Sequence, residues 1–322
     1  MDEQEIARAV AVLGRGGLVA FPTETVYGLG ADAGNPAAIA KLYALKGRPA
    51  GHPVIVHLWD ADEVTRWARD VTACAHRLMN EFWPGPLTLI MRRAANVSDA
   101  VTGGQDTVGL RVPAHPVARA LLKAFGGGIA APSANRFGRV SATTAEHVRQ
   151  EFGDAVDLVI DGGQTEVGIE STILDVTTEQ PVLVRPGHIS AAAIERCVGV
   201  VPLTPEAYAG RASGTLAVHY APDTLLVIAA GALLHERVAE LARTGKRVAV
   251  LARQPTAALA AAATWITAPA DPAGYAHELY ANLRALDRAQ CDVILLEQLP
   301  ASPEWTAIND RIRRAAARAE NA

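Results

Sequence analysis

The chain has 322 residues, of which half are hydrophobic and a fifth are charged, as is typical of a soluble globular protein with two domains. Its net charge of −4 excludes an overall basic field for nucleic acid, so any RNA contact would need a local patch. Cys74, Cys197 and Cys291 lack paired spacing, which argues against a zinc site or a disulfide framework and favours a reducing cytoplasm. The acidic N-terminus is unlike a secretory signal and no apolar run approaches membrane-spanning length, so we expect a cytoplasmic protein without membrane contact.

The first 201 residues contain many short predicted elements. A helix is expected over Gln4–Gly14, where apolar residues recur at helical spacing. A buried strand over Gly17–Phe21 should end at Pro22, which cannot donate to a sheet ladder. Asn35 is the predicted N-cap of a helix over Pro36–Lys46. Later strands are predicted at 54–58, 87–91, 107–112, 128–131, 158–161, 171–176 and 182–185, and later helices at 74–82, 115–125 and 190–197, with one more that Thr143 or Thr144 caps and that reaches Phe152.

The composition changes at Pro202. Residues 202–222 are rich in Pro, Ala, Gly, Ser and Thr without a period, which is typical of a linker. Beyond them, strands predicted at 225–228, 248–251, 265–266 and 293–296 alternate with helices, which predicts a small parallel α/β domain. We therefore expect a catalytic domain over 1–201, a linker over 202–222 and a second domain over 223–322.

Polar groups follow the predicted strands of the first domain at four places. These groups are Thr23 and Thr25; Lys46, Arg48 and His52; Ser133 and Asn135; and Ser171 and Thr172. Arg111 and Arg185 lie on strands, where an unpaired charge would be costly to bury. Cations and hydroxyls in one pocket suit an anionic ligand, above all a nucleoside triphosphate. The alternative for the stretch after Pro22 is a capped turn before a helix, and the alternative for His57 is an ordinary structural histidine.

Five motifs occur in a characteristic order. They are Pro22-Thr23-Glu24-Thr25-Val26-Tyr27-Gly28-Leu29, Lys46-Gly47-Arg48-Pro49, Pro132-Ser133-Ala134-Asn135, Gly168-Ile169-Glu170-Ser171-Thr172 and Arg185-Pro186-Gly187. This set resembles the YrdC-type family, and more closely its two-domain L-threonylcarbamoyladenylate synthases. The resemblance spans about residues 14–201 and resumes at His219-Tyr220-Ala221-Pro222. Between these, the chain lacks the Lys and the first Tyr of the subfamily's commoner linker motif.

The resemblance implies a fold and an activity. The expected fold class is α/β, with an N-terminal twisted open mixed sheet and helices, a long linker and a small C-terminal parallel, Rossmann-like domain. The expected reaction joins L-threonine, bicarbonate or CO₂, and ATP into L-threonylcarbamoyl-AMP and releases pyrophosphate. The product would serve the modification of a tRNA adenosine next to the anticodon. Mg²⁺ carried by ATP is the expected cofactor, without metal ligands from the protein, and tRNA or a threonylcarbamoyl transferase is the expected partner.

The resemblance also implies roles for individual residues. The central, catalytic group would be Lys46, Arg48, Ser133 and Asn135. The ATP-binding residues would be Arg48, His52, Thr107, Ser133, Ser141, Arg185 and Tyr220. The threonine-binding residues would be Thr25, His57, Arg111 and Ser171, with Arg111 as the partner of the carboxylate.

Three alternatives concern function. The chain could be a non-catalytic RNA- or tRNA-binding module, in which surface arginines matter more than Ser133 and Asn135. It could form carbamoyl-AMP for hydrogenase maturation, although its three isolated cysteines argue against the zinc motifs of that class. The linker could be a lid that shields a labile anhydride from water, or a passive tether.

Overall fold

The computed structural model describes residues 2–254 and 262–317, which form two compact units. The first unit contains the residues up to Phe137 together with Ala142–Thr215. The second contains Gly138–Ser141 and the residues from Leu216 onward. The segment that composition marks as a linker is therefore divided at Thr215, and the grouping of Gly138–Ser141 with the second unit has no signal in the sequence.

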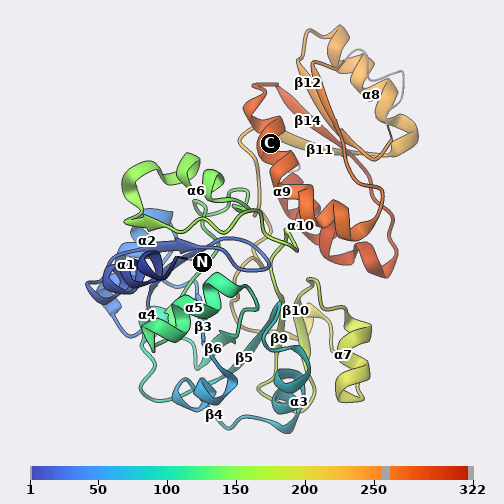
Figure 1. The fold of residues 1–322 in the computed structure, drawn as a ribbon. Helices are drawn as coiled ribbons and strands as arrows, with labels where there is room; N and C mark the ends of the chain where they lie inside the picture. The colour runs from blue at the N-terminus through green and yellow to red at the C-terminus, as the bar shows by residue number, and fades with distance from the viewer. Residues whose placement is uncertain (1, 255–261, 318–322) are drawn as a thin grey trace. The chain divides into compact units, whose positions relative to one another are not determined.

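A mixed β-sheet forms the framework of the first unit (Figure 1). Its strands are β1 (Val19–Phe21), β2 (Gly28–Asp32), β3 (Ile55–His57), β4 (Ala68–Arg69), β5 (Leu87–Arg93), β6 (Thr107–Arg111), β7 (Ile129–Ala130), β8 (Leu158–Val159), β9 (Thr172–Asp175) and β10 (Val182–Arg185). They lie in the order β10-β9-β5-β6-β3-β7-β2-β1-β8, with β4 beside β5. The pairs β1–β8, β3–β6 and β5–β9 are parallel and the others are antiparallel, which confirms the predicted mixed sheet.

Helices cover both faces of this sheet. They are α1 (Glu3–Gly14), α2 (Pro36–Lys46), α3 (Ala73–Phe82), α4 (Asp99–Thr102), α5 (Pro116–Phe125), α6 (Ala145–Phe152) and α7 (Ala191–Val198). Because side chains alternate along a strand, Val19 and Phe21 enter a core formed with α1 and α5, whereas Ala20 enters the core formed with α2, α3 and α6. The predicted start of α2 is confirmed, since Asn35 Oδ1 accepts a hydrogen bond of 3.0 Å from Ala37 N and Pro36 is the first helical residue.

The stretch after Pro22 joins two antiparallel strands. Phe21 on β1 pairs with Gly28 on β2, so residues 22–27 form the connecting loop and the alternative of a turn before a helix is wrong. Strand β2 is absent from the sequence-based prediction, because glycine is unfavourable in strands and Gly28 and Gly30 hide its alternation. The packing leaves no room for a side chain at Gly30, since a Cβ there would lie 2.8 Å from Ile129 Cγ2 and Phe21 Cε1.

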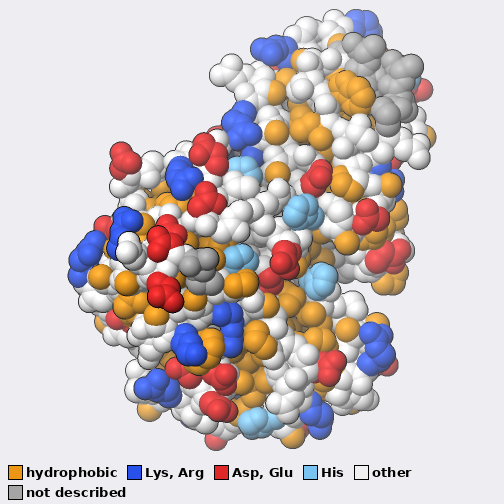
Figure 2. All heavy atoms as spheres, viewed as in Figure 1, with side chains coloured by type: hydrophobic (Ala, Val, Ile, Leu, Met, Phe, Trp, Pro, Cys, Tyr) orange, Lys and Arg blue, Asp and Glu red, His pale blue; other side chains and the backbone are white. Residues whose placement is uncertain are grey.

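The second unit has a parallel sheet, as predicted. Its described strands are β11 (Leu225–Ala229), β12 (Val248–Ala252), β13 (Thr264–Thr267) and β14 (Val293–Glu297), in the order β11-β14-β12-β13. Its helices are α8 (Gly231–Arg243), α9 (Pro272–Arg288) and α10 (Thr306–Ala316). Across the described ranges, no helix combines the length and apolar character needed to cross a membrane. Figure 2 shows acidic and basic side chains interspersed over the visible face, as the small net charge predicts.

The β1–β2 hairpin should depend on Gly30. We expect Gly30→Ala to lower the free energy of unfolding of the first unit by roughly 1–3 kcal/mol, because the added methyl group overpacks the space between Ile129 and Phe21. Gly14→Ala is the matched control, since a Cβ there meets no described atom within 4 Å. Urea unfolding of both variants measures the difference, and equal unfolding midpoints would contradict the packing argument.

Candidate active site

The loop between β1 and β2 carries three buried polar residues, Thr23, Glu24 and Thr25. Thr23 Oγ1 donates to Val26 O at 2.6 Å and lies 2.9 Å from Thr25 Oγ1. The backbone N–H groups of Thr25 and Val26 also reach Thr23 Oγ1, each at 3.2 Å. These contacts form a turn of the kind that serine and threonine side chains stabilise. The turn fixes the orientation of both hydroxyl groups.

Arg111, at the end of β6, joins this loop to the sheet. Its Nη2 donates to Glu24 Oε1 at 2.6 Å, its Nη1 donates to Thr25 Oγ1 at 2.9 Å, and its Nε donates to Gly85 O at 3.2 Å. The Arg111 and Glu24 side chains are only 5% and 6% exposed. Glu24 Oε2 also accepts from Ala114 N at 3.1 Å. Sequence reasoning missed this role of Glu24, since the two partners stand 87 residues apart.

The Arg111 guanidinium has capacity for a ligand. A guanidinium carries five N–H groups, and the three bonds above leave two without a partner among the described residues. A buried cation needs hydrogen-bonding partners, and paired N–H groups in a planar fork match a carboxylate. Arg111 therefore combines a fixed position with donors suited to an anion.

His57 lies beside Arg111, because the two residues are partners in the parallel β3–β6 pair. The imidazole is buried, and its Nδ1 has no hydrogen-bond partner among the described residues. Burial, and after it the charge of Arg111, lower the pKa of His57 to about 3. The imidazole is therefore neutral near pH 7. A neutral ring with one unpartnered nitrogen is unusual for a purely structural histidine, since buried polar atoms are normally paired.

Ser171 and Arg185 meet at the start of β9. Arg185 Nη2 donates to Ser171 O at 2.8 Å and to Ser171 Oγ at 3.2 Å. Ser171 Oγ also lies 2.8 Å from Thr88 Oγ1 on β5. The preceding residues pack on the first loop, since Gly168 N donates to Thr25 O at 3.1 Å. Ser171 is therefore held in the same framework as Thr25.

Lys46, Ser133 and Asn135 form a second cluster. Lys46 is the last residue of α2, and its Nζ donates to Ser133 O at 2.6 Å and also to Asn135 O. Two of the three ammonium donors are used this way, which leaves one for a ligand. Burial, and after it the charge of Arg48, lower the pKa of Lys46 well below its ordinary value. The cluster is tied to the first loop, because Ala134 N donates to Tyr27 O at 2.7 Å.

Arg48 is held by the loop after α2. Its Nη2 donates to Pro53 O at 2.7 Å and to Ser213 Oγ at 3.2 Å, and its Nε donates to His52 O at 3.2 Å. Lys46 and Arg48 are only 3% and 7% exposed, although Gly47 and Pro49 beside them are exposed. Tertiary contacts, which local composition does not reveal, bury both side chains.

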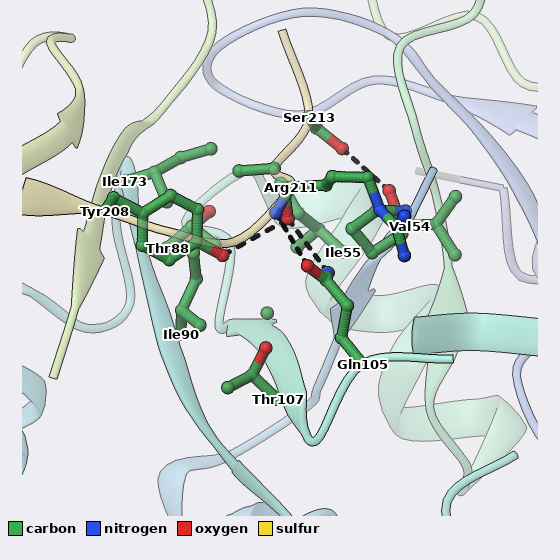
Figure 3. Close-up of a pocket in the computed structure, with 13 residues that line it drawn as sticks. Val54, Ile55, Thr88, Ile90, Gln105, Thr107, Ile173, Tyr208, Arg211 and Ser213 are labelled. Carbon is green, nitrogen blue, oxygen red and sulfur yellow. Dashed lines mark hydrogen bonds between the residues drawn. The ribbon is translucent and has the colours of Figure 1, made fainter. Parts of the chain in front are cut away.

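A pocket lies between the sheet and residues 208–213 of the linker segment (Figure 3). Ile55, Ile90 and Ile173 give it apolar walls, and the predicted ATP residue Thr107 lines it together with Thr88 and Gln105. Tyr208, Arg211, Ala212 and Ser213 supply the linker side of the pocket. Arg211 N donates to Gln105 Oε1 at 2.6 Å, and burial raises the pKa of Tyr208 to about 12.

Ser213 bridges two predicted ATP-binding residues. Its Oγ contacts Arg48, as described, and donates to Pro53 O at 3.2 Å. Its carbonyl oxygen accepts from Arg185 Nη1 at 2.9 Å. Sequence reasoning missed Ser213, because an isolated serine in a linker carries no signal. Arg48 and Arg185 are thus brought to one segment of chain.

Ser141 and Tyr220 are assigned to the second unit. The Tyr220 ring is buried, stacks on Tyr280 at 5.8 Å and lies 5.2 Å from the Arg311 guanidinium. Ser141 O accepts from Arg284 Nε at 3.2 Å. Their predicted contacts with ATP stay predictions, whereas the other predicted site residues all lie in the first unit.

Two family models match consecutive parts of the chain. The model described as telomere recombination (Sua5, YciO, YrdC) matches residues 11–187, and the model described as the threonylcarbamoyl-AMP synthase C-terminal domain matches residues 189–317. The chain belongs to the Sua5/YrdC family. The synthase C-terminal domain follows the first domain in the chain, so the prediction of a two-domain member of the family is confirmed.

Sua5/YrdC relatives of similar length share more than a third of the sequence. A Pyrococcus abyssi protein named threonylcarbamoyl-AMP synthase is 36% identical, over 98% of this chain and 95% of its own. A Bacillus subtilis protein of the same name is 38% identical, over 98% and 94%. The crystal structure of P. abyssi Sua5 complexed with L-threonine matches with a TM-score of 0.92 at 36% identity, over 98% and 95% of the two chains. The predicted fold class is confirmed at full length.

The buried Glu24–Arg111 pair should contribute strongly to stability. We expect Glu24→Gln to lower the free energy of unfolding by about 3 kcal/mol, because removing the carboxylate leaves a buried guanidinium without its counter-charge. Asp99→Asn is the matched control in the same unit, because Asp99 also pairs with an arginine, Arg93, but its side chain is 74% exposed. This substitution should lower the free energy of unfolding by less than about 1 kcal/mol. Chemical denaturation compares the two, and equal losses would show that burial of the pair is unimportant.

Proposed function

We propose that this chain synthesises L-threonylcarbamoyl-AMP from L-threonine, CO₂ or bicarbonate, and ATP, with release of pyrophosphate. The observation that carries the proposal is that one unit holds both clusters. Arg111 with Thr25, His57 and Ser171 forms an amino-acid site, and Lys46 with Arg48, Ser133 and Asn135 forms a phosphate site. Relatives that match the chain at full length carry the name of this activity, and one of their structures holds L-threonine.

The amino-acid half of the reaction follows from Arg111. The threonine carboxylate takes the two remaining N–H groups of the guanidinium as a bidentate pair. The neutral His57 imidazole and the hydroxyls of Thr25 and Ser171 then surround the amine and the side chain. The neutral amine attacks CO₂, the new N–C bond gives a carbamate, and one proton is lost to water, a step that needs no covalent help from the protein. Positioning is the contribution of these residues.

The nucleotide half follows from the cations. A carbamate oxygen attacks the α-phosphorus of ATP, the bond from that phosphorus to the bridging oxygen breaks, and pyrophosphate leaves with the electron pair. Lys46, Arg48 and Arg185 offset the negative charge that develops on the phosphates, as in other phosphoryl transfers. The amide of Asn135 and the hydroxyl of Ser133 orient the nucleotide. Because the displaced group is already anionic, the reaction requires little acid–base work.

Mg²⁺ fits this site only as a companion of ATP. Magnesium prefers carboxylate, phosphate and water oxygens. Glu24 is the carboxylate of the first loop, and its two oxygens are bonded to Arg111 and Ala114 N. The other groups proposed to face the phosphates are cations, amides and hydroxyls. We therefore assign the metal to the phosphates of ATP, where it neutralises charge.

The linker segment Tyr208–Ser213 is proposed to cover the reaction. It lines the pocket together with strand residues (Figure 3), and it also bonds to Gln105 and Arg48. Exclusion of water would protect the mixed anhydride from hydrolysis. This assignment favours the lid over the passive tether, because a tether would need none of these bonds.

The proposal places the enzyme in the cytoplasm, where its product would serve tRNA modification through a threonylcarbamoyl transferase.

The alternative of a non-catalytic RNA-binding module finds less support. Relatives that match the chain at full length carry the name of a synthase, which favours the synthase over such a module. The synthase C-terminal match also favours a two-domain synthase over an enzyme of hydrogenase maturation.

Pyrophosphate release tests the proposed function. The full chain should release pyrophosphate only when L-threonine, bicarbonate and ATP are all present, and omission of any one should abolish release. Lys46→Ala and Arg48→Ala should each reduce the rate at least about tenfold, because each removes a charge that stabilises the transition state. Lys123→Ala is the control, since this lysine lies over the Trp59 ring rather than in either cluster. Release without threonine, or unchanged rates in both site variants, would refute the proposal.

A further inference from the structure

Gln105 lies just before β6 and lines the pocket together with Arg211 of the linker segment. Its Oε1 accepts a hydrogen bond of 2.6 Å from Arg211 N, and its Nε2 donates to Arg211 O at 3.0 Å (Figure 3). A backbone N–H can only donate and a carbonyl oxygen can only accept, so the two partners fix which end of the amide faces each group. The side chain therefore pairs with both backbone groups of one linker residue.

Two further bonds hold Arg211 at this point. Its Nη2 donates to Gly103 O at 2.9 Å, and its carbonyl oxygen also accepts from Tyr208 Oη at 3.2 Å. Arg211 O thus has a donor for each of its two lone pairs, one from Gln105 and one from Tyr208. The turn before β6, which contains Gly103 and Gln105, therefore anchors the linker segment at a single residue through its backbone and its side chain.

Ser213 follows Arg211 by two residues and contacts two arginines that are proposed to bind ATP. Its Oγ accepts from Arg48 Nη2 and donates to Pro53 O, each at 3.2 Å. Its carbonyl oxygen accepts from Arg185 Nη1 at 2.9 Å. Because two residues of chain span at most about 7 Å, the position of Arg211 limits where Ser213 can lie. The anchor at Arg211 therefore keeps Ser213 within reach of both arginines.

We propose that Gln105 is a positioning residue for ATP, which anchors Arg211 so that Ser213 holds Arg48 and Arg185 in place for the phosphates. The inference rests on the proposed function, since it takes both arginines to bind ATP. Groups that are already held in their binding positions lose less conformational entropy when the ligand arrives. The linker segment and ATP then stabilise each other, because coupling between two binding events is reciprocal. The linker segment thus sets the affinity for the nucleotide in addition to excluding water.

Titration calorimetry of the full chain with ATP and Mg²⁺, without threonine, measures this contribution. Gln105→Met keeps the length of the side chain, adds no charge and removes both hydrogen bonds to Arg211. We expect ATP to bind about fivefold more weakly, and the KM for ATP in the pyrophosphate assay to rise by the same factor. The affinity for L-threonine should stay within about twofold of the wild-type value, because Thr25 and Arg111 are held by the β1–β2 loop and β6.

Gln180→Met is the matched control in the same unit. Gln180 Nε2 likewise donates to a backbone carbonyl, that of Val201 at 2.7 Å, just before the linker. The control variant therefore loses a hydrogen bond of the same kind at a position that does not line the pocket. It should bind ATP with the wild-type affinity, whereas a general effect of loosening this part of the chain would weaken ATP binding in both methionine variants.

A double variant tests whether Gln105 acts through Ser213. Ser213→Ala removes the hydroxyl that Arg48 contacts and should itself weaken ATP binding. In the double variant the loss of affinity should be smaller than the product of the two single losses, because both changes affect one interaction.

Three results would overturn the inference. They are single losses that multiply in the double variant, an ATP affinity in Gln105→Met that equals or exceeds the wild-type value, and equal losses of affinity for ATP and threonine in that variant. A wild-type chain that neither binds ATP nor releases pyrophosphate would instead refute the proposed function.

Discussion

The buried Arg111 guanidinium imposes the main constraint on the first unit. A cation that is 5% exposed is stable only if fixed hydrogen-bond acceptors replace water around it. Glu24 supplies the counter-charge, Thr25 a hydroxyl oxygen and Gly85 a carbonyl. Two of these acceptors come from the loop between β1 and β2. The loop must therefore be held against β6, and the β1–β2 hairpin and the neighbouring strands do this.

The same loop also connects the remaining motifs. Its backbone bonds to the segment before Ser171 through Thr25 O, and to the segment of Ser133 and Asn135 through Tyr27 O. Lys46 reaches the carbonyls of that second segment from the end of α2. A single six-residue connection thus relates the arginine that we propose binds a carboxylate to the lysine that we propose binds phosphate. This relation is what a reaction that joins an amino acid to a nucleotide requires, because its two substrates must meet at fixed positions.

The sequence predicted those helix and strand ends that are set by the chemistry of neighbouring residues. The cap at Asn35 and the strand end at Pro22 follow from hydrogen-bonding chemistry that two or three residues contain. The family resemblance supplied Arg111 and Lys46 as candidates but not their partners. Glu24 lies 87 residues from Arg111 and Ser213 lies 165 from Arg48, so only the folded chain reveals these contacts. Strand β2 escaped prediction because its glycines satisfy tertiary packing around Phe21 and Ile129 rather than a strand preference.

The central claim is that the two Arg111 N–H groups without a partner in the described part of the chain bind the carboxylate of an amino acid. The most direct measurement is the affinity of the full chain for L-threonine and for L-threoninol, which keeps the amine and the hydroxyl but has an alcohol in place of the carboxylate. The account predicts that L-threoninol binds at least about a hundredfold more weakly, because the buried guanidinium would be left without its anionic partner. Equal affinities for the two compounds would contradict it.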